Sequence, residues 1–168
     1  AKIIMKKKIL STYHETLYHL IMFRINQFTT SRSVLKMDYD SFMICSAVAS
    51  HINFQNLKKN NHLDWDGSWE MARSKSSKQI MKSEKLSIFA LSNILAIPQE
   101  SVRRKLIILE KKNFLQYTKK NGVCFGEKIE LFLPFAEKEM LSLSSFLKTL
   151  KKSGALEQLI QLTKKDFH

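Results

Sequence analysis

The chain contains little of what several protein classes require. Its 168 residues include only two cysteines, so a disulfide framework is excluded and a reducing compartment is expected. Its four glycines form neither a phosphate-binding loop nor a dinucleotide-binding fingerprint. No apolar run approaches the ~20 residues that a membrane-spanning helix needs. We therefore expect a cytoplasmic protein that does not span a membrane, with Cys45 as a small core residue in an apolar helix face.

Patterns typical of catalysis are also missing. The five histidines are dispersed along the chain and lack the i, i+4 spacing of a zinc-binding helix. The cysteines, Cys45 and Cys124, lie too far apart in sequence to make a zinc-site pair. No serine lies in a nucleophile-elbow context. We expect neither an enzyme nor a bound metal or cofactor.

Acidic residues are scarce relative to basic ones. The chain has 28 Lys and Arg against 15 Asp and Glu, a formal net charge of +13. Such a balance favours an anionic partner, nucleic acid before a membrane surface. A lysine bias of an A·T-rich genome is the alternative explanation for part of this charge.

The most informative stretch is 86–125, which reads as two helices followed by a hairpin. The first helix is predicted at Ile88–Leu95, and a turn at 96–98 leads to a second helix at 99–112, with Pro98 suited to its start. The second helix has one apolar stripe that would face inward: Val102, Leu106 and Leu109.

The other surface of the 99–112 helix is polar in its N-terminal half. Glu100, Arg104 and Ile108 lie opposite the apolar stripe. Gln99, Ser101, Arg103 and Lys105 lie on the flanks of the helix. An exposed N-terminal half of this composition is suited to reading base edges in a major groove.

A two-stranded hairpin is predicted after this helix, from Phe114 to Phe125. Asn121-Gly122 predicts a type I′ turn, in which both central residues have positive φ. Lys119 and Lys120 lie at the tip, where they would contact phosphates. Leu86-Ser87 would pair with the hairpin as a minimal third strand.

These segments resemble the winged helix-turn-helix of bacterial transcriptional regulators. The matching run is LSNILAIPQESVRRKL, from Leu91 to Leu106, and the match covers about forty residues up to the hairpin. Ala96 and Asn113 replace glycines of the usual pattern, and Asn tolerates a left-handed conformation better than most residues. The resemblance implies a mainly α (α+β) fold that binds double-stranded DNA, without identifying a subfamily, an operator or an effector.

Flanking helices are predicted on both sides of this region. A helix at 9–28, ended by Thr29-Thr30-Ser31, has a wide apolar stripe that would pack either on its own domain or on a second copy. Asp38 or Asp40 would cap a helix at 41–57 that supplies the first helix of the DNA-binding core. The remaining predictions are a helix at 68–81 near the presumed DNA face, a strand or linker at 127–133, and helices at 136–150 and 156–165.

Three parts follow from this reading. Residues 1–37 would form a dimerisation helix, 38–127 the winged helix-turn-helix domain, and 128–168 a C-terminal helical hairpin. The expected function is a homodimeric, sequence-specific DNA-binding transcriptional regulator. The alternatives are a winged-helix RNA-binding or protein-interaction module and a nonspecific nucleoid-type binder. The expected DNA contacts are Gln99, Glu100, Ser101, Arg103, Arg104, Lys105, Lys119 and Lys120.

Overall fold

The computed structural model describes residues 9–74 and 82–167, which fold mainly into helices with one small antiparallel sheet. This confirms the mainly α, α+β class. The chain divides into two units, one made of residues 1–30 and 135–168 and the other of residues 31–134. The first and last segments of the chain thus belong to one unit. No helix in the described ranges is both long and apolar enough to cross a bilayer.

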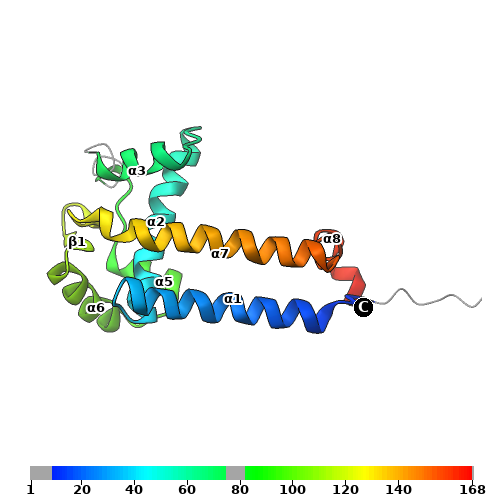
Figure 1. The fold of residues 1–168 in the computed structure, drawn as a ribbon. Helices are drawn as coiled ribbons and strands as arrows, with labels where there is room; N and C mark the ends of the chain where they lie inside the picture. The colour runs from blue at the N-terminus through cyan, green and yellow to red at the C-terminus, as the bar shows by residue number, and fades with distance from the viewer. Residues whose placement is uncertain (1–8, 75–81, 168) are drawn as a thin grey trace, which may run out of the picture. The chain divides into compact units, whose positions relative to one another are not determined.

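Unit 1 is built on two long helices, α1 (Tyr13–Val34, of which the part to Thr30 belongs here) and α7 (Leu133–Lys152, from Phe135 on). They lie side by side, with α8 (Ala155–Gln161) and the short helix η2 (Lys164–Phe167) following α7 (Figure 1). The rings of Phe23 and Phe146 stack with centroids 5.0 Å apart across the helix pair. The predicted end of the first helix at Thr29-Thr30-Ser31 was wrong, because the helix continues to Val34 and Ser31 is fully buried.

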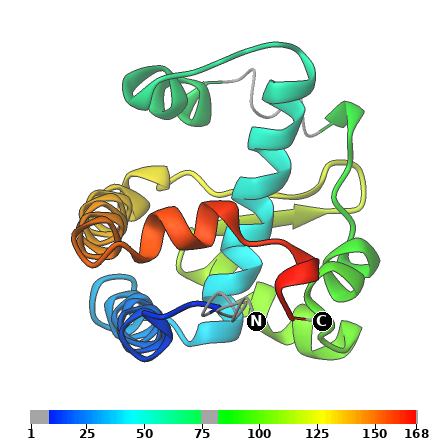
Figure 2. The same cartoon turned by 90° about the vertical axis from the view of Figure 1, so that its right-hand side faces the viewer.

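Unit 2 is organised around α2 (Tyr39–Lys58), which runs through its middle (Figure 2). Of the two predicted caps, Asp38 and Asp40, it is Asp38 that caps this helix, by accepting a hydrogen bond from the Ser41 N–H at 2.8 Å. Against α2 pack α5 (Ile88–Leu95) and α6 (Gln99–Lys111), whose bounds match the predicted ones to within one residue. The shared core contains the buried side chains of Ile44, Cys45, Val48, Leu91, Val102, Leu106 and Leu109.

Cys45 is a core residue, as predicted. It is buried in α2, and burial raises the pKa of its thiol to about 12. Leu57, the last residue of the helix predicted at 41–57, is more than half exposed. The helix passes the edge of the core before it reaches Leu57, since Gln55 and Asn56 are the last buried residues of α2.

The turn between α5 and α6 depends on a left-handed residue. Ala96 has φ 52° and ψ 39°, the conformation for which a glycine is usually needed. The Ser92 hydroxyl donates to the Ile97 carbonyl at 2.6 Å and holds the turn closed. Pro98 lies one position before α6, as its N-cap residue. Ala96 therefore keeps the turn geometry at a cost in backbone strain.

The hairpin pairs β1 (Leu115–Thr118) with β2 (Gly122–Phe125), in the register Thr118 with Gly122. The predicted type I′ turn was wrong, because only Gly122 of the Asn121-Gly122 pair has positive φ, at 72°. The loop is the three residues 119–121 followed by a left-handed glycine, a common hairpin form. The predicted pairing of Leu86 is confirmed by a bridge to Gly122.

Two further segments differ from the prediction. The segment 127–133 is neither strand nor linker but contains the 3₁₀ helix η1 (Ile129–Phe132). The ring of Phe132 packs on those of Phe114 and Phe125, so aromatic packing shapes the segment. The helix predicted at 68–81 begins earlier, as α3 (Trp65–Arg73), capped by Asp64, and its predicted residues 75–81 lie outside the described part of the chain.

The strain at Ala96 makes a prediction for stability. Ala96→Gly should raise the free energy of unfolding by about 0.5–1 kcal/mol, because glycine adopts the left-handed conformation without steric cost. Ala90→Gly, inside α5, should lower it by about the same amount. Urea denaturation of both variants measures this, and a destabilised Ala96→Gly protein would contradict the strain.

Candidate nucleic-acid interface

The surface of α6 divides into a buried stripe and an exposed polar side. Val102, Leu106 and Leu109 are the buried residues of the helix, as predicted. Gln99, Glu100, Arg103 and Arg104 are all exposed, and Ser101 is half-buried. The packing of the stripe on α2 and α5 thus determines which side chains α6 presents to solvent.

Two arginines on this exposed side have free hydrogen-bond donors. The Arg104 guanidinium makes one long contact, from Nη2 to Ser101 Oγ at 3.5 Å. Glu100 and Arg104, four residues apart on α6, do not form an ion pair in the described part of the chain. Arg103 likewise has no partner among the described residues. Each guanidinium has five N–H donors in a planar fork, so most of their capacity is available to a ligand.

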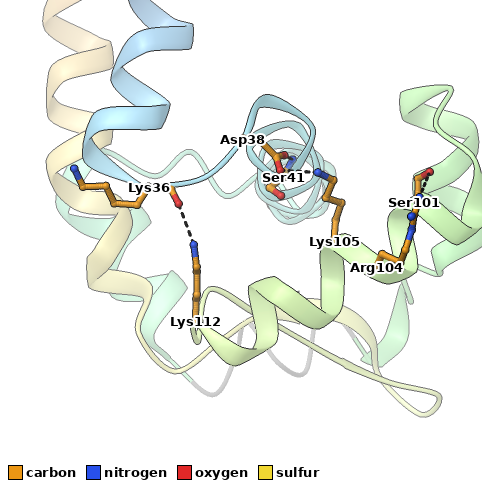
Figure 3. A network of polar contacts seen from close by, with 7 residues as sticks. All are labelled: Lys36, Asp38, Ser41, Ser101, Arg104, Lys105 and Lys112. Carbon is orange, nitrogen blue, oxygen red and sulfur yellow. Dashed lines mark hydrogen bonds and ion pairs between the residues drawn. The ribbon is translucent and has the colours of Figure 1, made fainter.

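Lys105 is directed elsewhere, although it was predicted as a DNA contact. Its ammonium donates to Asp38 Oδ2 at 2.6 Å and forms an ion pair with the residue that caps α2 (Figure 3). Lys112, near the other end of the helix, donates to the Lys36 carbonyl at 3.0 Å. The two lysines hold α6 to the segment that precedes α2, a positioning role that the sequence did not indicate.

The Asp38 carboxylate therefore caps α2 and also pairs with Lys105 of α6. Partial burial alone would raise the pKa of Asp38, but hydrogen bonds from Lys105 and Ser41 outweigh it and hold the pKa below its ordinary value. The carboxylate is stabilised in its charged form, which both the helix cap and the ion pair need.

A second group of basic side chains lies at the hairpin tip. Lys119 and Lys120 are exposed there, as their positions in the three-residue loop require. Lys85 joins them, because its Nζ donates to the Lys119 carbonyl. Sequence reasoning missed Lys85, although it directly precedes Leu86, for which pairing with the hairpin was predicted.

Gly122 allows the chain at Leu86 to lie close to the hairpin. A Cβ at Gly122 would lie 2.5 Å from the Leu86 carbonyl oxygen, closer than such atoms approach. The chain before Leu86 can therefore lie against the hairpin only because this position has no side chain.

The segment containing α3 does not belong to this surface. Figures 1 and 2 place α3 at the end of α2 that is far from α6. The Arg73 guanidinium pairs with the Glu130 carboxylate of η1, with Nη2 to Oε2 at 3.0 Å. The expectation that this segment lies near the DNA face was wrong for the residues that the structure describes.

Nothing in the described ranges gathers three or more His, Cys, Asp or Glu side chains as metal ligands. No protein-family model, curated protein or solved structure matches this chain. This surface presents two kinds of group to a ligand: hydrogen-bond donors on α6 and cations at the hairpin tip.

The double role of Asp38 predicts a pH dependence of stability. A carboxylate whose pKa is lowered by folding contributes stability above its unfolded pKa of about 3.9, and that contribution is lost as the pH falls through the lower folded value. Asp38→Asn keeps an oxygen for the helix cap but loses the charge. At pH 7 its free energy of unfolding should lie below that of wild type by less than about 1 kcal/mol, because the pair is partly exposed. This difference should shrink as the pH falls from about 5 to below 3.

Urea denaturation across this pH range checks the prediction. Asp38→Ala is the control, because it loses the cap as well as the charge. Its deficit should be larger than that of Asp38→Asn, should fall by the same amount with pH, and should level off at about 1 kcal/mol below pH 3. A deficit of Asp38→Asn that does not change with pH would show that the ion pair contributes nothing.

Proposed function

We propose that the chain is a sequence-specific double-stranded DNA-binding protein that acts as a transcriptional regulator. In this proposal α6 lies in the major groove, and the β1–β2 hairpin contacts the sugar–phosphate backbone as a wing. The observation that carries the proposal is the exposed N-terminal half of α6, which presents Gln99, Arg103 and Arg104 from a helix fixed by its buried stripe.

The dimensions and chemistry of α6 support this role. A major groove about 12 Å wide admits one α-helix, and residues in its N-terminal half then reach the base edges. Arginine pairs best with guanine and glutamine with adenine, while Glu100 is suited to accept from cytosine. Ser101 can donate to either a base or a phosphate.

The charge of the chain supports binding to a polyanion. The net charge of +13 attracts phosphates, and each lysine–phosphate contact releases counterions on binding. Lys119 and Lys120, with Lys85 beside them, form the compact basic group at the hairpin tip. A second copy of the chain would allow two half-sites to be read together.

One observation favours a protein-interaction module as the second candidate. The C-terminal half of α6 exposes Ile107 and Ile108, and α5 exposes Phe89 and Ile94. Exposed apolar side chains beside arginines are also typical of protein interfaces. A transcriptional regulator should select one DNA sequence and a protein-interaction module should not, so one experiment distinguishes them.

Selection of bound sequences from random duplex DNA and RNA pools tests the proposal. We expect convergence on one duplex DNA motif with two related half-sites. Recovery of RNA in place of DNA, or binding to DNA without sequence enrichment, would contradict sequence-specific DNA recognition. Absence of any nucleic-acid binding would favour the protein-interaction candidate.

Two sets of variants separate base reading from phosphate contact. Arg104→Ala should weaken binding to the selected duplex by about 1–3 kcal/mol and affect random duplexes much less. The double variant Lys119→Ala, Lys120→Ala should weaken both duplexes alike and reduce the dependence of affinity on salt. Fluorescence anisotropy at several salt concentrations measures both effects.

The matched control is Lys138→Ala, an exposed lysine on α7 in unit 1. Its binding should stay near wild type. A sequence-selective loss in the Lys119, Lys120 double variant would assign base contacts to the hairpin, and an unchanged Arg104→Ala protein would remove Arg104 from the reading surface.

A further inference from the structure

One exposed residue of α6 differs in character from the polar side chains around it. Ile107 is 53% exposed, although burial of an isoleucine normally stabilises a fold. It follows Arg103 by four residues and Arg104 by three, so the three side chains are neighbours on the helix surface. Together with Glu100 they have the spacing i, i+3, i+4, i+7, which defines one face of a helix. Ile107 thus lies in line with the proposed base-reading residues.

The contacts of two other residues show which way this face is turned. The Tyr117 N–H of β1 donates to Glu110 Oε1 at 2.8 Å, so the hairpin lies on the Glu110 side of α6. At ~100° per residue, Ile107 is about 60° from Glu110 around the helix axis. Lys105 reaches Asp38 on another side of the helix (Figure 3). Ile107 is therefore exposed on the side of α6 that is turned toward the hairpin.

The other exposed apolar side chains of α5 and α6 are placed differently. Ile108 is 47% exposed, but it follows Lys105 by three residues and shares its side of the helix. That side is about 160° around the axis from the residue that contacts the hairpin. Phe89 and Ile94 are exposed on α5, not on the proposed reading helix. Of these four residues, only Ile107 lies both on α6 and on its hairpin side.

The major groove contains one apolar group that such a side chain can recognise. Each base pair presents hydrogen-bonding groups there, and thymine adds its C5-methyl group. An isoleucine side chain makes no hydrogen bond, so it can distinguish base pairs only by contact with that methyl group. The charges beside Ile107 favour a duplex as the occupant of this surface, because Arg103, Arg104 and Lys111 are exposed around it and attract phosphates.

We propose that Ile107 is a specificity-determining residue that contacts the C5-methyl group of a thymine in the bound duplex. This inference rests on the proposed function, because it requires α6 in the major groove. Ile107 lies ~6 Å beyond Arg103 along the helix axis, and base pairs are stacked at ~3.4 Å. The thymine is therefore expected within about two base pairs of the guanine that Arg103 or Arg104 reads.

Replacement of thymine by deoxyuridine tests this contact, because it removes the methyl group and leaves the base pairing unchanged. Each thymine of the duplex recovered by selection is replaced in turn, and fluorescence anisotropy measures the affinity of the full chain. With the wild-type protein, one replacement per half-site should weaken binding roughly fourfold, the contribution of one buried methyl-sized group. With Ile107→Ala, the same replacement should have almost no effect, because the contact is already lost.

Ile108→Ala is the matched control, since it removes an exposed isoleucine from another side of the same helix. It should keep the full effect of the replacement. Urea denaturation checks that both variants remain as stable as the wild type to within a few tenths of a kcal/mol, as expected for exposed positions. A replacement that weakens the wild type and Ile107→Ala alike, or an effect lost in Ile108→Ala instead, would overturn the role of Ile107.

The inference and the proposed function fail in distinguishable ways. Selection of one duplex motif in which no deoxyuridine replacement weakens binding would overturn the thymine contact and leave DNA recognition standing. Absence of any sequence selection would contradict the proposed function and the thymine contact together, before any modified duplex is made. Ile107 would then belong to the surface of the protein-interaction candidate.

Discussion

The packing of one apolar stripe determines what this protein can present to a partner. Val102, Leu106 and Leu109 of α6 are buried against α2 and α5, and a buried side chain of that size stabilises the fold by roughly 1.5–3 kcal/mol. Rotating α6 would expose this stripe, so the polar side of the helix is kept outward. The presentation of Arg103 and Arg104 to solvent is thus a consequence of core packing.

Two lysines complete the positioning of α6. Lys105 reaches Asp38 and Lys112 reaches the Lys36 carbonyl, so both hold the segment between α1 and α2. Leu35 and Met37, in that same segment, are buried in unit 2. The chain that leaves α1 is therefore attached to the proposed reading helix by apolar packing and by polar contacts.

The sequence predicted those elements whose signals are local. Helical periodicity and the proline at 98 placed α5 and α6 to within a residue, and the Asn121-Gly122 turn signal placed the hairpin. Asp38 was predicted, with Asp40 as the alternative, to cap this helix, because capping joins residues three apart. Its pairing with Lys105 was missed, since the two residues are 67 positions apart and only the folded core brings them together.

Other misses have the same tertiary origin. Ser31 looked like a helix end from its neighbours, but it is buried within α1. The 127–133 segment was predicted as a strand or linker, but it contains a 3₁₀ helix whose Phe132 ring packs on Phe114. The apolar face of α1 was visible in the sequence, yet only the structure shows that Tyr18, Ile21 and Ile25 on it are exposed.

Amide chemical shifts of the full chain, titrated with a duplex recovered by selection, test the central claim most directly. If α6 reads the groove and the hairpin contacts phosphates, the largest changes should fall at residues 99–104 and 118–121. Changes confined to α3 or α7, with the 99–104 amides unmoved, would contradict the role of α6.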